Sequence, residues 1–222
     1  MKAGNKSYSD LSELPETIPV FPLSAALLLP GGNLPLNIFE PRYLAMLDAA
    51  LAGDRIIGII QPEFDADEKL DQPPLCKVGC MGRVSAFQET GDGRMVINIA
   101  GISRFRLLEE VDGKDGYRRA RVAGFAGDLG DMSEAEAMVD REALLETFKQ
   151  FLEANELEAD WEGVSEAGTE TLVNSLSMMS PYGPAEKQAL LEAPDLKTRA
   201  ETLIAITEMT LAREAGETAT LQ

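Results

Sequence analysis

Short apolar runs separated by turn residues fill the first 125 positions of the chain. Ile18 to Leu23 and Leu34 to Phe39 each contain proline, which suits strands at an edge or rim rather than in the middle of a sheet. Further strands are expected at Arg55 to Gln61, Arg83 to Thr90, Arg94 to Ala100, Phe105 to Leu108 and Tyr117 to Phe125. Six or seven short strands at this spacing predict a closed or nearly closed β-barrel.

Two local signals refine this pattern. The Gly91-Asp92-Gly93 stretch between two β-rich runs predicts a hairpin. One helix interrupts the strands, because Pro41 suits a first helical turn and leucines recur at helical spacing up to Gly53.

The rest of the chain has helical periodicity. Ser133 with Glu136 matches a capping box, which predicts a helix whose apolar face holds Met138, Leu145, Phe148 and Leu152. A second helix is marked by Leu172, Leu176 and Met179, a short third runs from Ala185 to Glu192, and Asp195 caps the last. The predicted fold class is therefore α+β, with a flexible segment at 1–17, a barrel at 18–125, a linker at 126–132, a helical bundle at 133–214 and a flexible tail at 215–222.

Charge supports a division into two modules. The 222 residues carry 20 basic and 38 acidic side chains, a formal net charge of −18. Residues 1–125 hold 14 basic and 17 acidic side chains, a net charge of −3, whereas residues 126–222 hold 6 and 21, a net charge of −15. Acidic runs such as Glu153, Glu156, Glu158, Asp160 and Glu162 are most simply a solvated surface.

The missing residue types exclude several chemistries. The chain contains no histidine, so Ser-His-Asp and Cys-His hydrolases are excluded. Cys76 and Cys80 cannot by themselves complete a structural zinc site. If both lie on one strand, their geometry allows a metal or redox pair. The simpler interpretation is that they are two small buried residues. We expect no cofactor and no metal.

No apolar run approaches the ~20 residues that cross a bilayer, and the first seventeen residues lack an apolar signal region. We therefore expect a cytoplasmic protein with reduced cysteines.

Four segments together resemble a known family. They are Ile18-Pro19-Val20-Phe21-Pro22-Leu23, Leu34-Pro35-Leu36-Asn37-Ile38-Phe39-Glu40-Pro41-Arg42-Tyr43, Val78-Gly79-Cys80-Met81-Gly82-Arg83-Val84 and Gly101-Ile102-Ser103-Arg104-Phe105. Their order and spacing are similar to those of the amino-terminal substrate-binding domain of Lon, the ATP-dependent protease La, over about residues 18–212. The resemblance implies a PUA-like barrel of about six strands followed by a helical bundle, and a role in recognising proteins or peptides.

The resemblance stops short of catalysis. Full-length Lon continues into an ATPase and a serine-lysine peptidase, whereas none of the eight lysines here lies in a Gly-x-x-x-x-Gly-Lys-Ser/Thr loop. We expect a non-catalytic module that binds exposed apolar or unstructured segments of other proteins, with a protease or chaperone as a possible partner and without nucleic acid or membrane.

The expected binding site is a shallow apolar groove where barrel and bundle meet, or an exposed strand edge that pairs with an extended peptide. The candidate residues are Leu34, Leu36, Phe39, Tyr43, Met178, Met179 and Tyr182. Core packing is the alternative for each of them. A polar patch of Glu40, Arg42 and Arg104 is the candidate for further recognition, and an internal ion pair that fixes a helix start to a strand is its alternative.

The sequence leaves two other function classes to consider. A PUA-like barrel that binds RNA or a small ligand is the main alternative, because Arg118, Arg119 and Arg121 form a basic stripe with Arg104 and Arg106. A net charge of −18 and only 6% aromatic residues disfavour RNA. A carboxylate-only enzyme finds no support, since 38 acidic residues always supply some pair at a suitable distance.

Overall fold

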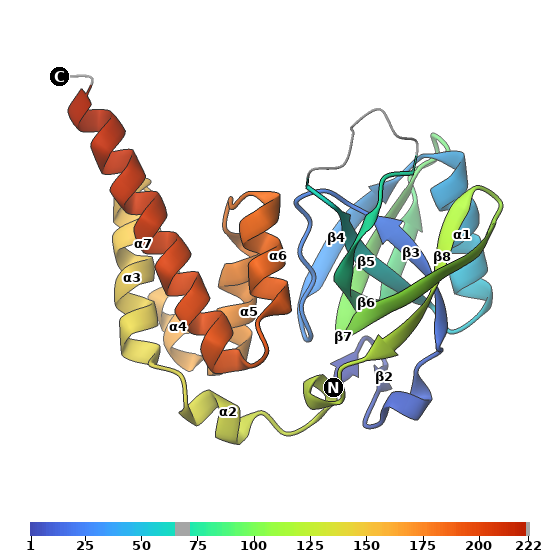
Figure 1. Cartoon of the computed structure of the whole chain (residues 1–222), viewed down its shortest axis with the longest axis horizontal. Coiled ribbons are helices and arrows are strands. Elements are labelled where there is room, and N and C mark those ends of the chain that lie inside the picture. Colours follow the sequence, from blue (N-terminus) through green and yellow to red (C-terminus); the bar gives the residue numbers. More distant parts are fainter. Residues whose placement is uncertain (65–71, 221–222) are drawn as a thin grey trace. The chain divides into compact units, whose positions relative to one another are not determined.

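The computed structural model describes residues 1–64 and 72–220. The chain divides into two compact units, which are described separately. The barrel unit comprises residues 1–130 and 181–191, and the helical unit comprises residues 131–180 and 192–222 (Figure 1). Among the described residues, no helix combines the length and apolarity that crossing a bilayer requires.

Five strands of the barrel unit close into a ring. They are β3 (Thr17–Pro22), β5 (Ile56–Pro62), β6 (Leu75–Glu89), β7 (Met95–Lys114) and β8 (Tyr117–Gly124). β3 pairs with β5 in parallel, and antiparallel pairs β5–β6, β6–β7, β7–β8 and β8–β3 complete the circle. A sixth strand, β4 (Asn33–Ile38), pairs with the first half of β7. The expected α+β class, with a six-stranded barrel followed by helices, is confirmed.

The barrel interior is filled around Phe105 of β7, which is completely buried. Gly79 of β6 allows this packing, because a Cβ atom there would lie 2.5 Å from Phe105 Cζ and 2.6 Å from the Ile59 carbonyl oxygen. A contact that short forces the ring or the strand to shift. Close packing in the barrel interior therefore explains why a glycine occupies position 79.

Several predicted elements need adjustment. The runs Arg94 to Ala100 and Phe105 to Leu108 form one continuous strand, β7, and β6 begins at Leu75 rather than near Arg83. Helix α1 (Pro41–Ala52) lies where it was predicted and buries Tyr43, Met46, Leu47 and Ala50.

The first seventeen residues are more ordered than expected. They form a hairpin of β1 (Lys2–Ala3) and β2 (Lys6–Ser7) and a 3₁₀ helix, η1 (Leu11–Glu13). Ala3 and Tyr8 are fully buried in the same hydrophobic cluster as Phe105. Sequence patterns missed this segment because its apolar residues are single and separated by polar ones.

The segment 126–132 is not a linker throughout. Its first part forms the 3₁₀ helix η2 (Ala126–Leu129), in which Asp128 and Leu129 are buried. The predicted division between barrel and bundle also differs from the observed units, because α6 (Pro184–Glu192) groups with the barrel up to Leu191.

Two buried amides attach α6 to the barrel. Gln61 Nε2 of β5 donates to the Pro184 carbonyl at 3.0 Å and to Gln188 Oε1 at 3.1 Å. Gln188 Nε2 donates in turn to the Val78 carbonyl of β6 at 3.1 Å, and Gln61 Oε1 accepts from the Ala25 amide at 2.9 Å. Since buried amides are costly when unpaired, this chain of bonds specifies where α6 lies on the barrel.

The helical unit contains α2 (Ser133–Ala137), α3 (Arg141–Ala154), α4 (Trp161–Glu166), α5 (Thr169–Met179) and α7 (Leu196–Thr220). Helices α2, α3 and α5 pack against α7. Arg199 Nη1 of α7 donates to Asn174 Oδ1 of α5 at 3.0 Å, and both side chains are buried. α7 extends to Thr220, into the expected tail, and residues 221–222 lie outside the described residues.

The predicted capping box at Ser133 is wrong. Met132 is the N-cap of α2, and Glu136 Oε1 instead accepts from the Glu170 amide at 2.7 Å. The single helix expected from Met138 to Leu152 is broken, because Asp140 caps a new helix, α3, by accepting from the Ala143 amide. Met138 lies in the break and is exposed. The predicted cap of the last helix is present, since Asp195 Oδ1 accepts from the Thr198 amide at 2.8 Å.

Candidate functional site

Strand β4 lies outside the closed ring of the barrel unit. Its ladder partner is β7, with Leu34 opposite Ile99 and Leu36 opposite Ile97, and no strand of the described residues pairs with its other edge, which is the free edge of the six-stranded sheet. A free edge is a template for an added strand. Pro35 interrupts that template, because a proline in an edge strand turns its nitrogen to solvent and offers no donor there.

The side chains of β4 alternate between two environments. Asn33, Pro35 and Asn37 are exposed, whereas Leu34 and Leu36 are half-buried and Ile38 is buried. Leu36 lies opposite Ile97 of β7, which in turn lies opposite Phe87 of β6. Residues directly opposite each other share one face of a sheet, so Leu36, Ile97 and Phe87 form one apolar row.

The row ends at one exposed aromatic ring, and a second exposed ring directly follows β4. Phe87 is 49% exposed, and Phe39, directly after β4, is 60% exposed. The Arg94 guanidinium lies 5.9 Å from the centre of the Phe39 ring. We call Leu34, Leu36, Phe39 and Phe87 the β4 surface; it presents aromatic rings and leucine side chains on a rigid sheet, the chemistry that apolar peptide side chains fit.

The seven predicted peptide-binding residues differ in how far they are exposed. Phe39 and Met179 are exposed, Met179 to 82%, and Leu34, Leu36 and Met178 are half-buried. Tyr43 and Tyr182 are buried, which corrects the expectation that they line an open groove.

Tyr43 is buried because its ring packs on Phe21, with ring centroids 4.2 Å apart. Burial raises the pKa of its phenol, and the Arg42 guanidinium, 4.6 Å from the ring centre, opposes the increase. Tyr43 therefore fixes α1 to β3, and core packing is the role that its environment supports.

The predicted polar patch does not form as one group of exposed side chains. Glu40 and Arg42 pair with each other at the start of α1, with Arg42 Nη2 at 2.9 Å from Glu40 Oε2, and both are half-exposed. Arg104 is only 4% exposed, which is the correction to its predicted role at the surface. The alternative, an internal ion pair that links a strand to a helix start, describes Arg104.

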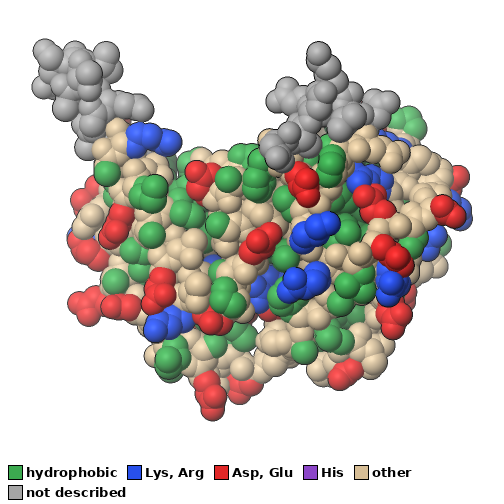
Figure 2. Space-filling view, viewed as in Figure 1, with side chains coloured by type: hydrophobic (Ala, Val, Ile, Leu, Met, Phe, Trp, Pro, Cys, Tyr) green, Lys and Arg blue, Asp and Glu red, His purple; other side chains and the backbone are tan. Residues whose placement is uncertain are grey.

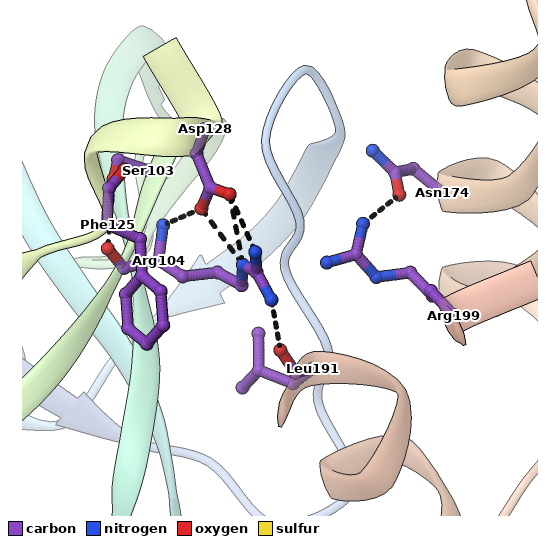
Figure 3. A network of polar contacts seen from close by, with 7 residues as sticks. All are labelled: Ser103, Arg104, Phe125, Asp128, Asn174, Leu191 and Arg199. Atoms are coloured by element: carbon purple, nitrogen blue, oxygen red, sulfur yellow. Dashed lines mark hydrogen bonds and ion pairs between the residues drawn. The ribbon is translucent and has the colours of Figure 1, made fainter. Parts of the chain in front are cut away.

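Asp128 of η2 is the partner of Arg104 (Figure 3). Arg104 Nη2 donates to Asp128 Oδ1 at 2.7 Å, Nε donates to Oδ2 at 2.9 Å, and the Arg104 backbone amide donates to Oδ2 at 2.8 Å. Arg104 Nη1 reaches the Leu191 carbonyl of α6 at 3.2 Å, and the guanidinium lies 4.9 Å from the Phe125 ring centre. This two-pronged pairing satisfies a buried charge and joins β7, η2 and α6 within the barrel unit.

Three of the five arginines of the basic stripe that motivated the RNA alternative are paired with acidic side chains. Arg118 donates to Glu110 at 2.6 and 2.7 Å, and Arg121 donates to Glu109 at 2.8 Å. Arg104 is paired as well, whereas Arg106 and Arg119 take part in none of the ion pairs of the described residues. Pairing thus reduces the unopposed positive charge on which binding of a phosphate backbone depends.

Neither cysteine is at a surface. Cys76 and Cys80 of β6 are both buried, which confirms the simpler interpretation of this pair. Among the side chains that the structure describes, no three of the His, Cys, Asp or Glu type gather closely enough to hold a metal ion.

Sequence reasoning missed Phe87, Asp128 and the Gln61–Gln188 pair. Phe87 was visible as an apolar position in the predicted strand Arg83 to Thr90, and the alternation of that strand is the signal that identifies its face. Asp128 and Gln188 carry no local signal, because their partners lie 24 and 127 residues away.

Comparison with known proteins gives a consistent result. Residues 17–208 match the family model of the ATP-dependent protease La (LON) substrate-binding domain. A Lon protease of Flavobacterium johnsoniae is 26% identical over 195 residues, and Lon protease 2 of Myxococcus xanthus is 27% identical over 202 residues. Each alignment covers 86% of this chain but only 24% and 23% of the relative, so the chain spans about a quarter of these proteins.

Solved structures share the fold. The N-terminal domain of Mycobacterium avium complex Lon protease superposes with a TM-score of 0.63 at 20% identity, covering 86% of this chain and 98% of that one. A Lon N-terminal domain protein from Xanthomonas campestris gives a TM-score of 0.57 at 23% identity, covering 85% and 97%. The order of barrel and helices is thus the same in all three.

Proposed function

Because the chain belongs to the family of ATP-dependent protease La (LON) substrate-binding domains, we propose that it is a non-catalytic module that binds exposed apolar segments of unfolded proteins. The observation that carries the proposal is the β4 surface, in which the apolar row from Leu36 ends at the exposed ring of Phe87 and the exposed ring of Phe39 directly follows the strand. Its role in the cell is to hold such segments for a protease or chaperone.

The β4 surface favours recognition through side chains over a complete backbone ladder. Pro35 removes one donor from the middle of the free edge, which limits an added strand to a few hydrogen bonds. Apolar contacts do not depend on a fixed sequence, so weak binding to many unfolded chains follows. Such binding is insensitive to salt, because screening acts on charges.

Fluorescence anisotropy of a labelled, uncharged peptide with leucine and phenylalanine residues tests the proposal. The double variant Phe39→Ser/Phe87→Ser should weaken binding by about tenfold or more, because each ring is expected to contribute about 1 kcal/mol. Both side chains are half-exposed, so the thermal midpoint should change little. Mass spectrometry should find the peptide intact after prolonged incubation.

Phe64→Ser is the matched control, since Phe64 is 54% exposed in the same unit but lies outside the β4 surface. It should bind the peptide as the unchanged protein does. Equal affinity of the double variant, or equal losses in the double variant and the control, would refute the assignment of this surface.

A further inference from the structure

An open groove runs along α3 of the helical unit. Its volume is about 940 Å³; Leu145 and Trp161 contribute apolar lining, and Glu142, Glu146 and Lys149 contribute charged lining. A second hollow of about 310 Å³ shares Lys149 and Trp161 and adds further apolar and acidic lining, namely Leu152, Glu153, Leu157 and Glu158. We call the two together the Trp161 groove.

The frame of this groove is fixed by specific contacts. Asp160 caps α4 by accepting from the Gly163 amide at 3.2 Å, which places Trp161 at the first position of that helix. Arg141 of α3 holds the same helix, since its Nη2 donates to the Val164 carbonyl at 2.8 Å. Trp161 therefore stands at a defined position beside α3.

Trp161 is the single tryptophan of the chain, yet it lies at the surface of the groove rather than in a core. It is 43% exposed, and Leu157 on the same groove is 54% exposed. Tryptophan carries a large apolar area and dominates many binding interfaces, so its exposure beside leucines marks a place where another chain gains contact area.

The charge around the groove is strongly one-sided. Residues 131–170 carry 13 acidic and 2 basic side chains, a net charge of −11. On the face shown in Figure 2, acidic side chains outnumber basic ones over the helical unit, whereas both signs mix over the barrel unit. Glu142, Glu146, Glu153 and Glu158 are exposed, and within the described part of the chain none of these four takes part in an ion pair.

The two nearby cations leave this charge unbalanced. Arg141 and Lys149 are the cations among the residues that line the groove, and Arg141 is committed to the Val164 carbonyl and to Thr169 Oγ1. Lys149 thus shares the lining with the four glutamates, of which Glu146 also accepts from Gln150 Nε2 at 3.0 Å. An uncharged apolar segment in this groove would desolvate carboxylates without compensation, whereas lysine or arginine side chains would pair with them. A second copy of the chain, with a net charge of −18, is repelled.

We infer that the Trp161 groove binds basic apolar segments of client proteins, in which lysine or arginine residues flank large apolar side chains. The inference rests on the proposed function and names a second class of client, bound by charge and by the indole together. The β4 surface and the Trp161 groove then differ in a measurable way, because salt weakens only binding at the groove.

The emission of Trp161 tests the inference directly. A twelve-residue peptide of alternating lysine and leucine should shift this emission to shorter wavelength with saturation, and high salt should reverse the shift. The same peptide with serine in place of lysine should give no shift. The triple variant Glu142→Gln/Glu153→Gln/Glu158→Gln should weaken binding of the basic peptide by about tenfold, as three exposed ion pairs are worth about 0.5 kcal/mol each.

A matched variant controls for net charge. Asp48→Asn/Asp112→Asn/Glu208→Gln removes the same charge from exposed positions outside the groove, and it should bind the basic peptide as the unchanged protein does. An unchanged Trp161 emission, or equal weakening in both triple variants, would overturn the inference. The proposed function is tested separately, by binding of the uncharged peptide at the β4 surface. Failure of one proposal therefore does not decide the other.

Discussion

The barrel unit and the helical unit expose apolar side chains in different electrostatic surroundings. In the barrel unit, Phe87 ends a row of strand residues and Phe39 directly follows β4, and the face of this unit shown in Figure 2 carries charges of both signs. In the helical unit, Trp161 and Leu157 lie among glutamates that no described ion pair neutralises. The two proposed binding sites should therefore differ in their response to salt, because screening acts on charges.

The two units also differ in how they bury arginine. Arg104 of the barrel unit is held by the Asp128 carboxylate, whereas Arg199 of the helical unit donates to the neutral Asn174 amide (Figure 3). A buried guanidinium beside a carboxylate becomes highly sensitive to loss of its partner, since an isolated buried charge is strongly unfavourable. Loss of the Asp128 carboxylate should therefore destabilise the barrel unit strongly.

The largest expected effect comes from Asp128→Ala. This change leaves the buried Arg104 guanidinium without its carboxylate, and we expect a loss of about 3–5 kcal/mol in the free energy of unfolding. Urea unfolding followed by circular dichroism gives the value, and Trp161 emission reports the helical unit in the same samples. Asp128→Leu combined with Arg104→Met should restore much of the stability. A loss below about 1 kcal/mol for the single variant would contradict the assigned role.

A smaller effect distinguishes core from surface among the predicted peptide-binding residues. Tyr43→Ala removes a buried ring that packs on Phe21 and should cost about 2–4 kcal/mol. Met179→Ala changes a side chain that is 82% exposed and should alter stability by less than about 0.5 kcal/mol. Thermal unfolding of both variants checks this contrast, and similar midpoints would show that exposure is a poor guide here.

The smallest effect concerns pH and the last helix. Hydrogen bonds from the Thr198 backbone and side chain hold the pKa of Asp195 below its ordinary value. Because the pKa of Asp195 is lower in the folded state, the cap contributes its full stabilisation at pH values above the ordinary pKa of an aspartate. This stabilisation is lost as the pH falls through the lowered pKa of the folded state. Asp195→Ala should cost about 0.5–1 kcal/mol at pH 7. Urea unfolding monitored by Trp161 should show this difference shrinking below about pH 4. A difference independent of pH would contradict a charged cap.

Sequence patterns predicted those features that depend on neighbours in the chain. The strands of the barrel, the helix at Pro41 and the cap at Asp195 follow from periodicity and local hydrogen bonding. The apolar residues around Asp140 keep helical spacing, so their pattern predicted one continuous helix. The break at Asp140, where this residue caps a second helix, was therefore not predicted.

The candidate site was predicted less completely, for a physical reason. Phe39 is exposed and Tyr43 is buried because different residues pack over the two rings. The ring that packs on Tyr43 belongs to Phe21, which lies more than twenty residues earlier in the chain. The partnership of Arg104 with Asp128 likewise joins separate elements. Such long-range contacts carry no periodic signal.

The assignment of α6 to the barrel unit has a consequence for biosynthesis. The ribosome releases every strand of the ring before residue 181, yet the amides of Gln61 and the guanidinium of Arg104 meet Pro184, Gln188 and the Leu191 carbonyl only afterwards. The fifty residues 131–180 of the helical unit must therefore be made before the last polar groups of the nascent barrel are satisfied. A fragment that ends at residue 130 carries this unfinished state permanently, which makes 1–191 the shortest amino-terminal piece that contains the whole barrel unit.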